Sequence, residues 1–135
     1  MDKEALQEIL EEVAADCVRQ LALRVDAVEP GAVRLSLPVA PALVHAGGVV
    51  CGQALMAAAD TAMLMAMVAE LGAFRPMTTV QLQTSFLRPV PKEASHVSLV
   101  ARVLRRGKNL SYGEIELLTP DGKLAAHATT TYALI

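Results

Sequence analysis

Asp60 is the residue whose position most clearly suggests chemistry. It is the one charged side chain between Val49 and Ala69, a run that otherwise holds apolar, small or uncharged residues. An unpaired carboxylate among apolar residues costs several kcal/mol or becomes neutral, so a chain that keeps one there usually uses it. An exposed helix edge, or an aspartate tied to backbone amides, is the competing interpretation of the same run.

Two side chains with basic or nucleophilic chemistry precede this run, namely His45 and Cys51. A cysteine at a helix N-terminus can become nucleophilic, and a neighbouring histidine could activate it. Free cysteine is also commonly a small buried apolar residue, so covalent cysteine catalysis is only one interpretation. The histidines at positions 45, 96 and 127 show no paired ligand spacing, and the sequence therefore predicts no metal site.

These residues belong to the start and middle of one long predicted helix at residues 51–71. Its length is about 30 Å at about 1.5 Å per residue, and Gly72 is a plausible stop. Its apolar composition predicts burial on every side. A second, amphipathic helix is predicted at residues 3–21, where one apolar stripe contains Leu6, Ile9, Leu10, Val13, Cys17 and Leu21.

Alternating apolar and polar residues predict two strands before the long helix and four after it. In the third of these strands, Val80, Leu82 and Phe86 alternate with polar residues and should share one face. Short turn signals favour antiparallel pairing. We therefore expect one α+β domain over residues 1–135, an antiparallel sheet wrapped around one central helix, with strands at 22–28, 32–39, 78–88, 95–106, 109–119 and 123–134.

The composition narrows the classes of function. The chain has 135 residues, of which 53% are hydrophobic and 19% charged, with net charge −2. Such an apolar chain has surface to hide beyond one small core, so we expect a homo-oligomer. No basic run points to nucleic acid. Two cysteines favour a reduced, cytoplasmic protein over a disulfide scaffold. The central Asp60 and the absence of basic flanks argue against a membrane span.

The stretch from His45 to Gln53, with Asp60 seven residues further on, resembles the hotdog-fold acyl-CoA thioesterases. It resembles in particular the phenylacetic-acid-degradation and 4-hydroxybenzoyl-CoA thioesterase group, which typically shows Asn-x-x-Gly-x-x-His-Gly-Gly before an acid in the central helix. Here His45 stands at the Asn position, and Cys51-Gly52-Gln53 stands at His-Gly-Gly. The first glycine (Gly48) and the middle one of the closing triplet are kept, and similar segments occur at 59–62, 86–89 and 121–125.

The resemblance implies a hotdog fold and hydrolysis of a thioester. The backbone amides of Gly52 and Gln53, at the helix start, would form an oxyanion hole. Asp60 would act as general base or nucleophile, typically across a dimer interface. His45 could position water in place of the family's Asn. Thr79, next to Thr78, falls where the family often has a hydroxyl near the acid.

The resemblance also implies coenzyme A as part of the substrate rather than a separate cofactor. Four cationic residues at strand ends, Arg88, Arg105, Arg106 and Lys108, could bind its phosphates, although they could equally be solvated turn residues. Small residues and methionines near Asp60 leave room for a medium-chain or aromatic acyl group without choosing between them. We expect a homodimer of hotdogs assembled into a homotetramer.

Two other functions remain open at this stage. A hotdog hydratase or dehydratase acting on acyl-CoA or acyl carrier protein also pairs a loop histidine with a helix acid, and His45 with Asp60 could mimic that pair. A non-catalytic acyl-CoA-binding module would bind the ligand without turnover. The binding-module hypothesis predicts that Asp60→Asn has no specific effect on function.

Overall fold

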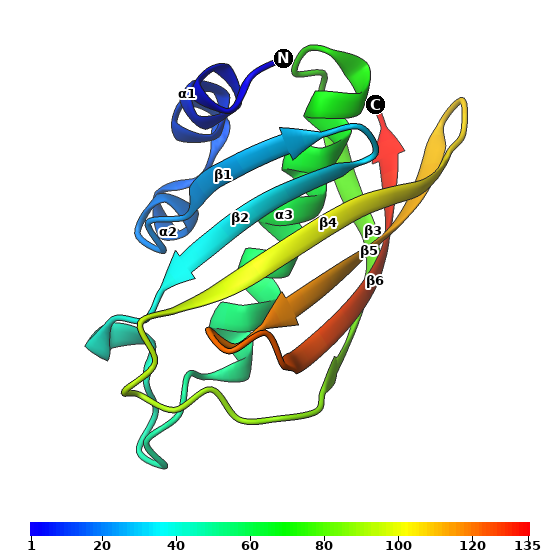
Figure 1. The fold of residues 1–135 in the computed structure, drawn as a ribbon. Coiled ribbons are helices and arrows are strands. Elements are labelled where there is room, and N and C mark those ends of the chain that lie inside the picture. The colour runs from blue at the N-terminus through cyan, green and yellow to red at the C-terminus, as the bar shows by residue number, and fades with distance from the viewer.

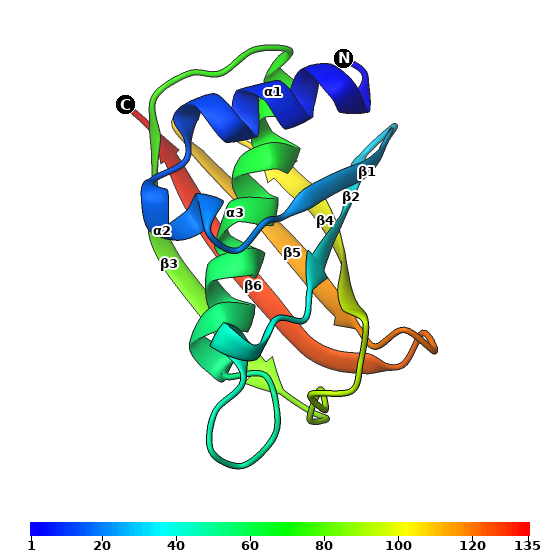
Figure 2. The same ribbon diagram turned by 90° about the vertical axis from the view of Figure 1, so that its left-hand side faces the viewer.

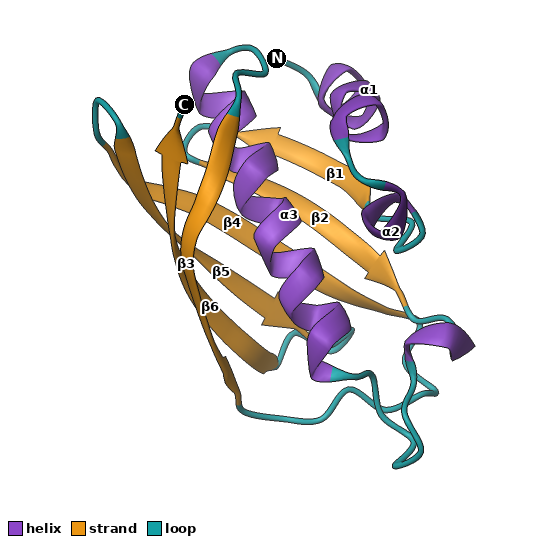
Figure 3. Ribbon diagram, turned by 180° about the vertical axis from the view of Figure 1, so that it is seen from behind, coloured by secondary structure: helices purple, strands orange, loops and turns teal.

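The chain folds into one curved antiparallel sheet wrapped around a single long helix (Figures 1 and 3). The computed structural model covers residues 1–135. The predicted α+β architecture is confirmed, and its strand boundaries agree with the sequence pattern to within about two residues. The elements are α1 (Lys3–Val13), α2 (Asp16–Arg19), β1 (Arg24–Glu29), β2 (Ala32–Pro38), a short 3-10 turn (Pro41–Leu43), α3 (Gly52–Leu71), β3 (Met77–Phe86), β4 (His96–Arg106), β5 (Leu110–Leu118) and β6 (Leu124–Leu134).

The six strands lie in the order β1-β2-β4-β5-β6-β3, and every neighbouring pair is antiparallel. The tight turns predicted from sequence are present, with Gly31 (φ 79°) between β1 and β2 and Gly122 (φ 84°) between β5 and β6. Only glycine adopts such angles without steric cost. The order leaves β1 and β3 as the two edges of the sheet.

Helix α3 crosses the concave face of the sheet and supplies much of the core (Figure 3). It ends at Gly72, whose φ of 80° is the left-handed cap that the sequence indicated. By length and composition α3 could span a membrane, but most of it is buried among the strands of this domain. The apolar surroundings of Asp60 are therefore those of a core helix.

The prediction that α3 is buried on every side is wrong for one stripe of the helix. Gln53 is exposed, and Met56, Asp60 and Leu64 are partly exposed, at a spacing of three to four residues. That spacing places them on one helical face. We call these four residues the open stripe of α3. Asp60 lies at its centre.

The predicted helix over residues 3–21 is also wrong, because the chain turns in the middle of it. Helix α1 ends at Val13, and Ala14 and Ala15 are extended before the four-residue α2. The Arg19 guanidinium donates to the Ala14 carbonyl at 2.6 Å, which stabilises the turn. Cys17, expected on the buried stripe, is exposed. No glycine or proline marks the break, since tertiary packing overrides local propensity there.

Helix α1 covers the β1 edge of the sheet (Figure 2). The side chain of Gln7 replaces a neighbouring strand at this edge. Its Nε2 donates to the carbonyl of Leu23 at 3.2 Å, and its Oε1 accepts from the amide of Val25 at 2.7 Å. The start of the β1 edge therefore has two of its backbone groups satisfied by a side chain of the same chain.

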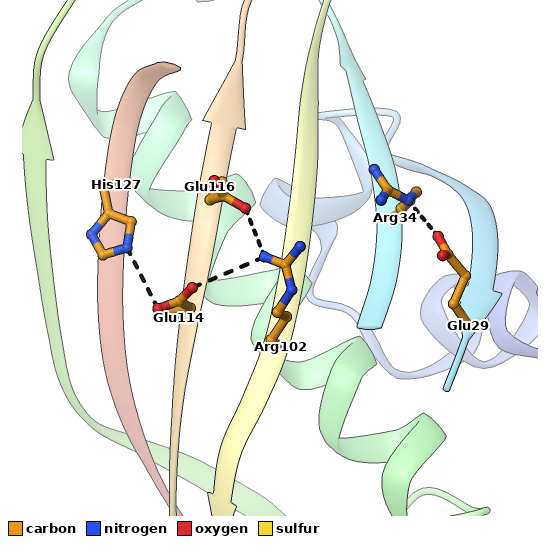
Figure 4. Close-up of polar contacts among 6 residues, drawn as sticks. All are labelled: Glu29, Arg34, Arg102, Glu114, Glu116 and His127. Carbon is orange, nitrogen blue, oxygen red and sulfur yellow. Dashed lines mark hydrogen bonds and ion pairs between the residues drawn. The ribbon is translucent and has the colours of Figure 1, made fainter. Parts of the chain in front are cut away.

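The convex face of the sheet carries a ladder of ion pairs (Figure 4). Arg102 on β4 contacts Glu116 at 2.6 Å and Glu114 at 4.0 Å, both on β5. His127 on β6 lies 3.8 Å from Glu114, and Arg34 on β2 pairs with Glu29 on β1. These side chains are all partly exposed, and such pairs stabilise a fold little. The convex face is therefore polar, and the candidate chemistry lies on the other face.

Candidate active site

Asp60 is held from the sheet by two hydroxyl groups. The hydroxyl of Thr79 on β3 donates to Asp60 Oδ1 over 2.7 Å. The phenol of Tyr132 on β6 lies 2.8 Å from the same Oδ1 and 2.7 Å from the Asp60 backbone carbonyl oxygen. The second carboxylate oxygen, Oδ2, makes no hydrogen bond within the chain. One oxygen is thus fixed to the fold and the other is free for chemistry.

A β-bulge in β3 brings Thr79 to Asp60. Thr79 is the register partner of Tyr132, but Gln81 pairs with Thr131, so Val80 is an extra residue between two pairs. The bulge turns Thr79 inward and leaves Val80 outward, 58% exposed. The prediction that Val80 shares the buried face of Leu82 is therefore wrong, and the shift places a hydroxyl beside the acid.

Tyr132 is the functional residue that sequence reasoning missed. Its ring is buried, and burial first, then the negative charge of Asp60, raises the pKa of its phenol above the ordinary value of 10.0. Tyr132 therefore keeps its proton and remains a hydrogen-bond donor at neutral pH. Tyr132 is 72 residues from Asp60 in the sequence. The only sequence signal that its side chain faces the helix is its position in a strand whose residues alternate between the two faces of the sheet.

The start of α3 offers free backbone donors. Cys51 is the N-cap, with extended angles (φ −68°, ψ 148°), and no side chain caps the helix. The amides of Gly52 and Gln53 therefore have no partner from a helix turn or a cap. A Cβ on Gly52 would lie 3.2 Å from the ring of Phe86, so glycine lets β3 approach the helix start closely. Such amides, at the positive end of the helix dipole, suit an oxyanion.

A cavity of about 440 Å³ adjoins this helix start. It lies between the segment that leads into α3 and the segment that follows β3, and most of its lining is apolar. Its residues are Val49, Val50, Gly52, Leu55, Phe86, Leu87, Arg88, Pro89 and Val90. An apolar cavity beside unpaired amides could take an apolar ligand with one polar carbonyl group.

The acid and the free amides lie too far apart to meet at one atom within a single chain. Gly52 and Asp60 are eight residues apart on α3, which is about 12 Å along the helix. Both contact the inner face of β3, Gly52 through Phe86 near the end of the strand and Asp60 through Thr79 near its start. The two halves of the predicted site are therefore placed at opposite ends of one edge strand.

His45 lies in the exposed loop before α3. Its Nδ1 accepts a hydrogen bond from the amide of Gly47 at 2.8 Å, and no hydrogen bond joins it to Asp60. It shares the end of the molecule with the free amides of α3 rather than with the acid of its own chain. Cys51 is partly buried and its side chain caps nothing, and no hydrogen bond links it to His45.

The four predicted phosphate ligands separate into two groups. Arg88 follows β3 and borders the cavity at the helix start, with its amide donating to Ala125 at the start of β6. Arg105, Arg106 and Lys108 lie at the tip of the β4–β5 hairpin, exposed and without an ion pair. Figures 1 and 3 show this tip projecting at the opposite end of the molecule from the start of α3. Along the strands the two groups lie roughly 27 Å apart.

A second cavity, of about 670 Å³, lies elsewhere, between α1, α2 and β1. Three of its polar residues are already hydrogen-bonded, Gln7 to Glu11 and to the backbone of β1, and Arg19 to the backbone of Ala14. No group of three or more histidine, cysteine or acidic residues is arranged to hold a metal ion. The chemistry therefore points to the α3–β3 region rather than to the cavity beside α1.

Comparisons with known proteins bear on the family and the fold. The family model described as Thioesterase superfamily matches residues 47–126. A protein of Thermoplasma acidophilum named as a candidate esterase is 26% identical over 115 residues, which is 85% of each chain.

Solved structures give the same fold. A Haemophilus influenzae thioesterase superposes with a TM-score of 0.86 at 22% identity, covering 96% of this chain and 90% of that one. The PaaI protein from the phenylacetic acid degradation operon of E. coli gives 0.85 at 20% identity, covering 98% and 93%. A conserved protein of Pseudomonas aeruginosa gives 0.83 at 29% identity, covering 93% and 98%.

The family match spans more than half of the chain, and it includes both the start of α3 and Asp60. The chain therefore belongs to the thioesterase superfamily and has the hotdog fold of its structural neighbours.

Proposed function

We propose that this protein is an acyl-CoA thioesterase whose active site is completed by a second copy of the chain. The observation that carries the proposal is the carboxylate of Asp60, which lies on the open stripe of α3 beside an edge strand that has no partner. A catalytic acid needs an oxyanion site within reach of the same substrate carbonyl group. Its own chain offers free amides only about 12 Å away.

A two-fold axis through the middle of β3 supplies the missing half. Antiparallel pairing of β3 with its copy sets the Thr79 end of one strand beside the Phe86 end of the other. Asp60 lies at the Thr79 end, and the start of α3 lies under Phe86. Each Asp60 would then face the partner's Gly52 and Gln53 amides. The same symmetry brings the partner's His45 loop to Asp60, where the imidazole could orient water.

The proposed reaction uses Oδ2 of Asp60 and the free amides. Oδ2 takes a proton from water while the water oxygen bonds to the thioester carbon, or Oδ2 itself attacks that carbon and water hydrolyses the resulting anhydride. The amides of Gly52 and Gln53 stabilise the negative charge on the carbonyl oxygen. In the first route the carbon–sulfur bond then breaks, and the thiolate recovers the proton from Asp60 as free coenzyme A. In the second route the carbon–sulfur bond breaks as the anhydride forms, and the thiolate takes the proton that water releases when it hydrolyses the anhydride.

The two-fold arrangement also gives the separated cations a common task. It turns one copy end for end, so that the partner's Arg105, Arg106 and Lys108 come to the same end of the dimer as Arg88. Guanidinium and ammonium groups suit the phosphates of coenzyme A, and none of the three hairpin cations has an acidic partner. The hairpin of one copy would bind the nucleotide end of a substrate whose acyl end reacts beside the start of α3 in the other copy.

The acyl group we propose is medium-chain or aromatic. The cavity of about 440 Å³ beside Gly52 is mostly apolar and is bordered by the ring of Phe86. The likeness to a protein from a phenylacetic acid degradation operon favours including aromatic thioesters. We further propose that dimers pair into a tetramer and that the protein works in the cytoplasm, where its two free cysteines would stay reduced.

Release of coenzyme A thiol from short, medium, long and aromatic acyl-CoAs tests the reaction. Asp60→Asn should fold, bind acyl-CoA and lose at least about 10²-fold in kcat. Glu70→Gln is the matched control, because it removes an exposed carboxylate from the same helix and should leave turnover unchanged. Tight binding without turnover in the wild type would reject the enzyme and favour a binding module, and hydration of enoyl-CoA would favour the hydratase.

The oxyanion donor can be removed from the backbone itself. Proline is tolerated at the first helical position, and the extended angles of Cys51 suit a residue before proline. Gly52→Pro therefore deletes one N–H group, whereas Gly52→Ala adds a similar Cβ and keeps it. We expect Gly52→Pro to lose about 10²-fold more kcat than Gly52→Ala. Equal activities of the two variants would show that this amide does not act in catalysis.

A further inference from the structure

The hydroxyls of Thr79 and Tyr132 converge on one oxygen of Asp60. Their distances to Oδ1 are 2.7 Å and 2.8 Å, and Oδ2 receives no hydrogen bond from the chain. A carboxylate oxygen can accept two donors at once. Because both donors come from the sheet, Oδ1 is held against strands β3 and β6, whereas Oδ2 has no such contact. The two oxygens of this carboxylate are therefore not equivalent.

We propose that Tyr132 is a positioning residue that acts with Thr79 to hold Oδ1 of Asp60, so that Oδ2 is the reacting atom. This inference rests on the proposed function and assigns the task of each oxygen within it. Tyr132 touches the acid but not the reacting atoms, so its effect passes through Asp60. Oδ2 is the reacting atom in both routes, whether it takes a proton from water or attacks the thioester directly.

The single proton of Tyr132 makes this contact sensitive to the charge of Asp60. The phenol oxygen lies 2.8 Å from Oδ1 and 2.7 Å from the Asp60 carbonyl oxygen, and it can donate its proton fully to one of them. A hydrogen bond to an ionised acceptor is stronger than one to a neutral acceptor. The proton should therefore favour Oδ1 while the carboxylate is charged, and the carbonyl oxygen when it is neutral. The hydrogen bond from Tyr132 to Oδ1 is thus strongest while the carboxylate is charged.

The local fold explains why both donors are in place. Thr79 and Tyr132 are direct partners across β3 and β6, and the bulge at Val80 turns Thr79 inward at this pair. Burial and the charge of Asp60 both raise the pKa of Tyr132, so the phenol remains a donor over the whole range in which a thioesterase works. Geometry, register and protonation therefore support the same role.

Tyr132→Phe is the direct test, because it keeps the buried ring and removes only the hydroxyl. We expect kcat to fall about tenfold, with KM unchanged and the acid limb of the pH–rate profile moved to higher pH. Thr79→Val should act in the same direction, and Thr79→Ser should restore activity. The matched control is Ser111→Ala, which removes an unpaired buried hydroxyl from the β5 residue that is the register partner of Tyr132. It should leave the profile unchanged.

A spectroscopic measurement separates this inference from the proposed function. The carboxylate stretch of Asp60 can be isolated as an infrared difference between wild type and Asp60→Asn. The same difference taken in a Tyr132→Phe background should show a shifted band even if no acyl-CoA is hydrolysed. An unshifted band and an unchanged pH–rate profile in folded Tyr132→Phe would overturn the assignment. A change in KM alone would also overturn it.

A second variant covers the case in which Tyr132→Phe does not fold. The chain has two tyrosines, so fluorotyrosine incorporated in a Tyr112→Phe background changes only the acidity of the residue 132 phenol. A more acidic phenol is a stronger donor, and the acid limb should move to lower pH. A profile that stays in place would contradict the role of Tyr132 as a donor to Asp60.

Discussion

The two edges of the sheet are treated in opposite ways. Strand β1 has six residues, three of them charged, and helix α1 covers it. The side chain of Gln7 bonds two backbone groups at the start of this edge, the carbonyl of Leu23 and the amide of Val25. Strand β3 has ten residues, none charged, and nothing in the chain covers its outer edge. Charges, a short strand and a covering helix are the usual protection against edge pairing, and β3 lacks all three.

The difference between the edges coincides with the position of the chemistry. The closed edge is far from any reactive group, whereas the open edge holds Thr79 against Asp60 and Phe86 against Gly52. Val80 and Phe86 on that edge are 58% and 51% exposed. The open stripe of α3 lies beside the same edge. We infer that β3 is left open because pairing with a second copy completes the site.

The largest expected effect comes from placing a charge on the outer edge of β3, where it would prevent pairing with a second copy. Val80→Lys places a cation on the bulge of β3, where a two-fold axis brings two copies of it to the same interface. We expect monomers with a native circular dichroism spectrum and a loss of at least about 10²-fold in activity, since Asp60 then has no oxyanion partner. Sedimentation and thiol release measure the two effects.

The matched control sits on the other edge. Asp26 occupies the bulge of β1 between Val25 and Ala27 and is exposed. Asp26→Lys should leave both the oligomeric state and the activity unchanged. If Val80→Lys stayed dimeric and active, or if Asp26→Lys dissociated the protein, the assignment of the open edge would be wrong.

A smaller effect, on stability, is expected from removing the side chain that bonds the β1 edge. Gln7→Ala removes two hydrogen bonds from β1 and should lower the free energy of unfolding by about 1–2 kcal/mol. Urea unfolding should show a lower midpoint with an unchanged slope. Glu8→Ala, on the same helix and exposed, is the control and should change little. An unchanged midpoint for Gln7→Ala would mean that α1 does not stabilise this edge through Gln7.

The smallest expected effect is that of Tyr132 on the free energy of unfolding, and it appears only in alkaline solution. Burial and the charge of Asp60 raise its pKa in the folded state above the ordinary 10.0. Above about pH 10 the unfolded chain loses this proton first, so stability is present below that pH and falls as the pH rises. The expected slope is at most about 1.4 kcal/mol per pH unit. In urea titrations above about pH 10, the free energy of unfolding of Tyr132→Phe should fall less steeply with pH than that of the wild type. Equal slopes would show that the raised pKa of Tyr132 is not the cause of the decline.

Local patterns predicted most of the fold. Helix 51–71 and all six strands follow from apolar periodicity and turn residues, which act over a few neighbours. The break after Val13 could not be predicted, because burial of Leu21 and Leu23 rather than any local signal bends the chain there. The bulge did leave a signal. Met77 and Leu82 are an odd number of residues apart, so they share the inner face only if one residue is extra.

The candidate site divides in the same way. Asp60 and Gly52 were predicted from a short motif, and Thr79 was predicted from the resemblance to a family that often has a hydroxyl there. Tyr132 was missed because its contact with Asp60 depends on how the last strand meets the central helix. The cations at 105, 106 and 108 were grouped with Arg88 because all four lie at strand ends. The direction of the strands, however, places Arg88 at one end of the folded molecule and the other three at the opposite end.

Mixed dimers of two inactive variants test the central claim most directly. Asp60→Asn and Gly52→Pro, carrying different affinity tags, are co-expressed and purified through both tags. If each site joins the acid of one copy to the amides of the other, the mixed dimer keeps one intact site and should recover about half of the wild-type kcat per dimer. If each site lies within one chain, no intact site exists, and a mixed dimer as inactive as its parents would contradict the account.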